Sequence, residues 1–146
     1  MHDAGLRSAE KRGRKRLGEP LVVLDAGFFV ALARRTQFAG EMLKRAKDRK
    51  TLTVAASTIS EFWRQHRGLG ESRFGLLRPV VFGVDEALAK RAGELLGATR
   101  GKNAMDAIVV ALAERLRADE IYTSDATDIE KLLSVSTHLG CEVIGV

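Results

Sequence analysis

The run Leu-Val-Val-Leu-Asp at residues 21–25 is the feature that most constrains the fold, because four apolar residues follow one another without alternation. A short continuous apolar run predicts a β-strand that is buried on both faces. Further strands are predicted at 51–56, 79–84, 120–124 and 141–146. Strands buried on both faces are typical of a parallel sheet with helices on each side.

Helical patterns alternate with these strands. They cover residues 26–35, 38–50, 57–67, 86–96, 104–116 and 126–133. Ser57, Asp85 and Asn103 are predicted N-caps, and Gly97 is the predicted end of the fourth helix. Glycines punctuate residues 67–78, which favours a loop. The alternation predicts an α/β domain with a central, mostly parallel sheet of about 4–5 strands between two layers of helices.

The composition fits a single globular body over residues 19–146, with 45% hydrophobic and 29% charged residues in the 146-residue chain. The only cysteine, Cys141, lies in the last apolar run, where we expect a buried, inert thiol. A single cysteine excludes a disulfide framework and indicates a reducing compartment. We therefore expect a cytoplasmic protein without a membrane association.

The basic N-terminal tail over residues 1–18 holds six of the lysines and arginines and only two acidic residues. One interpretation is an arm that binds phosphates, RNA included. The other is a flexible, solvated tail or an incorrectly assigned start of the chain. A signal peptide is disfavoured, because Asp25 interrupts the apolar stretch that would have to insert.

Four acidic residues follow the predicted strands or begin a helix: Asp25, Glu61, Asp106 and Asp125. Each has an ordinary structural interpretation. Asp25 and Asp125 could cap helices, Asp106 could be a first-turn acid, and Glu61 could be a solvated surface residue. In a parallel sheet, however, the carboxyl ends of the strands meet at one edge, where ligands bind. All four carboxylates are therefore predicted to converge on one rim.

Carboxylates brought together without basic partners repel each other. Either some of them keep a proton because their pKa is raised, or a hard cation neutralises them. Oxygen ligands of this kind suit Mg²⁺ or Mn²⁺ rather than zinc, and the three histidines show no ligand spacing. The motifs of receiver domains, haloacid-dehalogenase-type phosphatases, phosphate loops and dinucleotide sites are incomplete, which leaves a metal-dependent phosphodiesterase.

Four segments carry a resemblance to a known family: VVLDAGFFVAL, AASTISEFWR, NAMDAIVVALA and IYTSDATDIEKLL. In this order they resemble the four acidic motifs of PIN-domain ribonucleases, most closely the VapC-type toxins of toxin–antitoxin pairs. The resemblance covers residues 21–146 and implies a PIN-like three-layer fold. It also implies a metal-dependent endoribonuclease whose RNA cleavage is silenced by a protein antitoxin, and a homodimer.

The resemblance assigns Asp25, Glu61, Asp106 and Asp125 to the acidic quartet that binds one or two Mg²⁺ or Mn²⁺ ions. Asp128 matches a further acidic position of some members. Either Thr123 or Ser124 matches a hydroxyl that holds a carboxylate or water beside the last acid. By sequence proximity, three basic residues are candidates for binding flanking phosphates: Arg64, Arg100 and Lys102.

Several alternatives stay open from the sequence. The chain could be a PIN nuclease of RNA processing without an antitoxin, or a silent PIN module that binds RNA or protein without cutting. The presence of all four acids disfavours the silent module. Phe28 and Phe29 are bulkier than the family pattern suggests, and they belong either to the core or to an interface with a second copy or an antitoxin.

Overall fold

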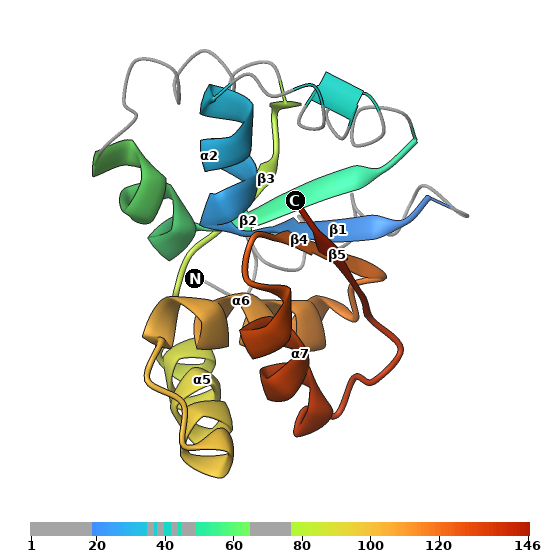
Figure 1. Cartoon of the computed structure of the whole chain (residues 1–146). Coiled ribbons are helices and arrows are strands. Elements are labelled where there is room, and N and C mark those ends of the chain that lie inside the picture. The colour runs from blue at the N-terminus through green and yellow to red at the C-terminus, as the bar shows by residue number, and fades with distance from the viewer. Residues whose placement is uncertain (1–18, 35–36, 38–39, 42–43, 45–48, 65–76) are drawn as a thin grey trace.

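The computed structural model describes residues 19–34, 37, 40–41, 44, 49–64 and 77–146 (Figure 1). Its centre is a five-stranded sheet of β1 (Leu21–Leu24), β2 (Thr51–Ala55), β3 (Val80–Phe82), β4 (Glu120–Thr123) and β5 (Glu142–Gly145). The spatial order is β3-β2-β1-β4-β5, and all neighbouring strands are parallel. The predicted α/β fold with its parallel sheet is confirmed.

Helices cover both faces of this sheet (Figure 1). They are α2 (Ala26–Ala33), a helix over 56–64, α5 (Glu86–Thr99), α6 (Ala104–Leu116) and α7 (Ala126–Ser134). The first two lie on one face, whereas α6 and α7 lie on the other and α5 packs against α6. Crossover connections between parallel strands are right-handed. The connecting helices therefore move to the other face of the sheet when the order in which strands are added reverses its direction. That reversal occurs between β3 and β4.

The β1 strand lies at the centre of the core. All four of its residues are buried, with Val22 and Leu24 in the cluster beneath α2 and Val23 in the cluster beneath α6. This alternation is the two-faced burial predicted from the unbroken apolar run.

Phe28 and Phe29 are core residues, with 1% and 3% of their surface exposed. The ring of Phe29 stacks on Phe62 from the helix over 56–64, with 4.4 Å between the ring centroids. The core interpretation of these two rings is therefore confirmed, and the interpretation that placed them in a protein interface was wrong.

Two predicted helix boundaries were wrong. Helix α5 continues past Gly97 to Thr99 and ends at Arg100, which adopts a left-handed conformation with φ 55°. Gly97 faces open space, so it does not need to stop the helix. Ser57 is not an N-cap, because the helix already begins at residue 56. Asp85 and Asn103 are N-caps as predicted, since their side chains accept hydrogen bonds from backbone amides of the first turn.

The basic tail over 1–18 lies outside the described residues, as do most of the predicted helix over 38–50 and most of the predicted loop over 67–78. Among the described helices, none combines the length and apolar composition that crossing a bilayer would require.

Candidate active site

The candidate site lies where the strand order reverses. From β1 the chain proceeds to β2 on one side, while β4 occupies the other side of β1. The carboxyl ends of two strands that diverge in this way border a crevice, which is the usual ligand position in open parallel sheets. Asp25 directly follows β1 and Asp125 follows β4 by two residues. The topology therefore brings these two acids to opposite sides of one crevice.

Asp25 is held by two hydrogen bonds. Its Oδ1 accepts from the backbone amide of Ala26 at 2.8 Å, which confirms its helix-capping interpretation. Its Oδ2 accepts from the Thr123 hydroxyl at 2.7 Å. Burial raises the pKa of Asp25, although both hydrogen bonds oppose that rise. Only 4% of Asp25 is exposed, so its carboxylate is fixed at the bottom of the crevice.

The Thr123 side chain, rather than that of Ser124, contacts the acidic residues. Its hydroxyl donates to Asp25 and accepts from the backbone amide of Asp125 at 2.9 Å. Ser124 is exposed, and its side chain lies against Gly27 at the start of α2.

Asp106 occupies the first turn of α6, beneath the Asn103 cap. It is 5% exposed, and its Oδ2 atom is buried without a hydrogen-bond partner. Burial raises its pKa to about 7, assisted by the charges of Asp25 and Asp125, by a hydrogen bond that the protonated form shares with Asp125, and by the charge of Glu61. A buried carboxylate oxygen without a partner is costly unless a proton or a ligand satisfies it.

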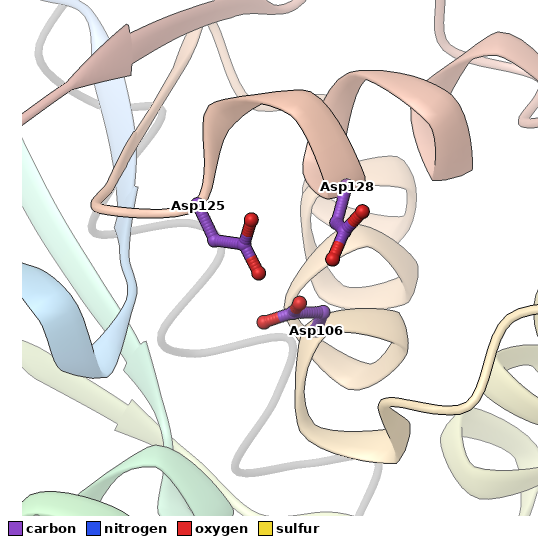
Figure 2. Close-up of side chains that lie close together, drawn as sticks. All are labelled: Asp106, Asp125 and Asp128. Carbon is purple, nitrogen blue, oxygen red and sulfur yellow. The ribbon is translucent and has the colours of Figure 1, made fainter.

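Among the described residues, Asp106, Asp125 and Asp128 form a group of three neighbouring carboxylates (Figure 2). Each contributes one oxygen, and these oxygens lie within 4.8 Å of one another. Asp125 stands at the N-cap position of α7 but makes no capping hydrogen bond with its side chain, so its capping interpretation was wrong. Figure 2 shows its carboxylate directed toward the space that it shares with Asp106 and Asp128. We call these three residues the aspartate triad.

Glu61 lies on the other side of the site. It is exposed on the helix over 56–64, and partial burial together with the charge of Asp25 raises its pKa, while Arg64 acts in the opposite sense. The four acids that the sequence singled out therefore act on one another electrostatically. Asp25 and Glu61 do not belong to the aspartate triad, whose third member is Asp128.

Within the part of the chain that the structure describes, no lysine, arginine or histidine forms an ion pair with the triad. Arg64, Arg100 and Lys102 are all exposed. Arg64 is the one placed beside an acid of the site, whereas no described contact connects Arg100 or Lys102 to a carboxylate. The described basic residues therefore supply no counter-charge to the triad, which could bind a metal ion.

A pocket of about 650 Å³ adjoins the site beyond Glu61 and Ser124. Its lining includes Arg34, which the sequence analysis missed because no motif surrounds this residue. Only the packing of α2 beside the helix over 56–64 brings Arg34 and Arg64 to the same hollow.

This combination of a parallel α/β sheet and a carboxylate cluster at its switch point is the arrangement that the four acidic motifs predict. A PIN domain model matches residues 22–132, and the chain therefore belongs to the PIN domain family. No protein with curated information matches the sequence significantly.

Solved structures share the fold at low sequence identity. A chain of the VapBC2 complex from Rickettsia felis, bound to a promoter DNA fragment, aligns with TM-score 0.64 and 11% identity, covering 86% of this chain and 98% of that one. A chain of a toxin–antitoxin complex from Klebsiella pneumoniae aligns with TM-score 0.63 and 17% identity over 84% and 95%. The Mycobacterium tuberculosis toxin VapC20, which cleaves the sarcin–ricin loop, aligns with TM-score 0.55 and 18% identity over 68% and 86%.

Proposed function

We propose that this protein is a metal-dependent endoribonuclease and the toxin of a type II toxin–antitoxin pair. The observation that carries the nuclease proposal is the Oδ2 atom of Asp106, which is buried without a partner and belongs to a triad without a described counter-charge. Three aspartate oxygens within 4.8 Å of one another suit a hard divalent cation.

Asp106, Asp125 and Asp128 would hold Mg²⁺ or Mn²⁺, with Asp25 and Glu61 adding negative charge from the other side of the crevice. When bound, such a cation supplies Lewis-acid activation of water and offsets the charge of the substrate phosphate. Thr123 positions Asp25 and the backbone that carries Asp125, so it orients the carboxylates without contacting substrate.

The toxin assignment is supported by the solved structures that share this fold. Chains from the VapBC2 complex, the Klebsiella complex and FitAB bound to a DNA fragment all share it. We therefore propose a protein antitoxin as the partner, RNA as the substrate, and a homodimer as the assembly. A PIN nuclease of RNA processing is the second candidate, and a reading frame for a small DNA-binding protein directly upstream would favour the toxin.

The decisive experiment measures cleavage of single-stranded RNA by the purified protein in Mg²⁺, in Mn²⁺ and in EDTA. We expect cleavage that requires the metal, and loss of at least about 100-fold in rate for Asp106→Asn in a folded variant. Glu130→Gln is a matched control, because Glu130 is exposed on α7 outside the triad. Undiminished cleavage by Asp106→Asn, or cleavage in EDTA, would overturn the proposal.

A further inference from the structure

The pocket beside the acidic site has one face formed by α2. Ala26, Val30, Ala31 and Arg34 line it together with Gly27, a set that recurs at helical spacing and so lies along one side of the helix. The opposite wall includes Glu61, Phe62 and Arg64 from the helix over 56–64. At about 650 Å³ the pocket falls within the range of about 300–1,000 Å³ of small-ligand sites.

The pocket lies beside the acidic site and shares Glu61 with it. Glu61 lines the pocket and also raises the pKa of Asp106 through its charge. Ala26 and Ser124 are the chain neighbours of Asp25 and Asp125, and both line the pocket. The pocket therefore borders the residues that flank Asp25 and Asp125 in the chain.

Charge changes sign along the pocket. Glu61 is the acidic side chain among its described lining residues, whereas Arg34 lies about 13.5 Å along the helix axis from Asp25 at a rise of about 1.5 Å per residue. Among the described residues, neither Arg34 nor Arg64 has an ion-pair partner. Arg91 and Arg115, by contrast, are engaged by Glu114 and Asp85.

Between the two arginines and the acids, the wall is formed largely by the small apolar residues Ala26, Val30 and Ala31. A site with an apolar wall and unpaired arginines matches a ligand that carries both a flat apolar ring and a phosphate. Proteins that hold single-stranded nucleic acids combine basic residues that follow the backbone with surfaces on which the bases lie, most often aromatic ones. An acidic peptide would use the arginines but would leave the apolar wall without a function.

We propose that this pocket binds the nucleotide adjoining the scissile phosphate, with its base on the wall of α2 and its outer phosphate held by Arg34 and Arg64. This inference rests on the proposed ribonuclease function, because the subsite would hold the RNA so that its scissile phosphate lies at the aspartate triad. Arg34 and Arg64 then become determinants of substrate affinity rather than of the chemical step.

The test measures binding of a fluorescein-labelled, eight-nucleotide single-stranded RNA to the full chain in EDTA, by anisotropy at several salt concentrations. EDTA separates binding from cleavage. We expect Arg34→Ala and Arg64→Ala each to weaken binding about tenfold and to lower the salt slope by about 0.7 per lost phosphate contact. Arg34→Lys should lose less RNA affinity than Arg34→Ala, because lysine retains the positive charge.

Lys90→Ala is the matched control, since Lys90 is exposed on α5 and its ion pair is with Glu86. Cleavage kinetics in Mn²⁺ form the second measurement, in which the arginine variants should raise KM while kcat changes little. Unchanged affinity, salt slope and KM in variants that still cleave RNA would overturn the subsite and leave the proposed function standing.

Three further outcomes are informative. Arginine-dependent RNA binding by a wild-type protein that cleaves nothing would support RNA binding in the pocket but overturn both the nuclease proposal and the placement of the pocket beside a scissile phosphate. An equal loss with Lys90→Ala would overturn the subsite, because binding would then follow net charge alone. A ten-residue poly-glutamate peptide that binds as tightly as RNA through the same arginines would overturn it in favour of an acidic protein segment.

Discussion

The hydroxyl of Thr123 joins the ends of two neighbouring strands by donating a hydrogen bond to Oδ2 of Asp25 over 2.7 Å. The Oγ1 atom of Thr123 also accepts a hydrogen bond from the backbone amide of Asp125 over 2.9 Å. Because Thr123 is fully buried, one hydroxyl fixes the carboxylate behind β1 relative to the backbone behind β4. The geometry of the crevice thus depends on an uncharged side chain.

Replacing Thr123 with valine should therefore weaken both stability and metal binding. The variant leaves a buried carboxylate oxygen and an amide without their shared partner, at a cost of about 1–3 kcal/mol in the free energy of unfolding. Urea unfolding would measure that cost, and the Mn²⁺-induced rise in Tm would report the metal site. Thr123→Ser keeps the hydroxyl and should behave nearly as wild type; an equally impaired serine variant would argue against the hydrogen bonds as the cause.

The pKa of Asp106 predicts how the metal-free protein responds to pH. This pKa is raised from 3.8 to about 7 in the folded state, so folding disfavours the ionised carboxylate. The associated loss of stability is absent below about pH 4, grows as the pH rises toward 7 and is complete above it. Thermal unfolding in EDTA should show that Asp106 destabilises the folded protein less at pH 5 than at pH 8.

Asp106→Asn isolates that contribution. The amide cannot ionise, so we expect the variant to be more stable than wild type at pH 8 by on the order of 1–3 kcal/mol, with the difference shrinking toward pH 4. A variant that is less stable at every pH would show that the carboxylate is needed for the first turn of α6 instead.

Divalent cations should stabilise the folded chain. A ligand at 100 times its Kd adds about 2.7 kcal/mol, so Mg²⁺ or Mn²⁺ should raise Tm by several degrees. Asp128→Asn should reduce that rise, because Asp128 contributes one of the triad oxygens, whereas Glu130→Gln should leave it unchanged. Equal rises in all three proteins would place the cation elsewhere.

Gly27 should not tolerate a methyl group. An added Cβ would lie 2.0 Å from Oγ and 2.5 Å from Cβ of Ser124, whereas at Gly93 it would meet nothing within 4 Å. Alanine is favoured over glycine in a helix by about 1 kcal/mol, so Gly93→Ala should stabilise the protein by up to that amount. In Gly27→Ala the overpacking should cost about 1–3 kcal/mol, so this variant should be less stable than wild type.

Chemical unfolding of the two alanine variants would test this reversal. Adding Ser124→Gly to Gly27→Ala removes the two closest side-chain atoms and should recover part of the loss. The backbone nitrogen of Ser124 remains 2.8 Å from the new Cβ, which prevents complete recovery. Equal stabilisation by both alanine substitutions would contradict the close approach of α2 to the end of β4.

Glu114 supplies a second pH dependence of opposite sign. Both of its oxygens bind Arg91, at 2.7 and 2.9 Å, and its side chain also accepts the amide of Thr137. The contact with Arg91 lowers the pKa of Glu114 to about 2, so the stabilisation is present above about pH 4.5 and is lost as the pH falls toward 2.

Glu114→Gln should therefore lower the free energy of unfolding at pH 7 by on the order of 1–3 kcal/mol, and the difference from wild type should narrow as the solution is acidified below pH 4. Glu94→Gln is a suitable control, because its distance to Arg91 is 3.8 Å and its side chain is largely exposed. A pH-independent difference for Glu114→Gln would attribute the effect to packing.

The layered fold could be predicted from the sequence because burial follows periodicity. The run at 21–25 predicts β1, which spans Leu21–Leu24 and leaves out only Asp25, and Asn103 marks the start of α6. The end of α5 could not be predicted in the same way. A glycine that faces open space costs a helix only a fraction of its stability, so Gly97 did not end it.

The edge of the sheet on which the acids meet follows from strand direction, but their grouping does not. Whether Asp25 or Asp128 joins Asp106 and Asp125 depends on side-chain directions and on the hydroxyl of Thr123, neither of which has a sequence period. Arg34 illustrates the same limit, since its position beside Arg64 arises only when two helices pack on one face.

The acidic site draws its carboxylates from residues as far apart as Asp25 and Asp128, carried by four separate elements. The triad lies on the segment from Asp106 to Asp128, whereas Asp25 and Glu61 come from elements much earlier in the chain, so the complete acidic site needs both parts folded together. The proposed activity would therefore arise late in biosynthesis, once β4 has inserted beside β1 and α7 has docked. A cell making such a nuclease would gain an interval, set by translation and folding, in which a partner can already be present before the chain can cut.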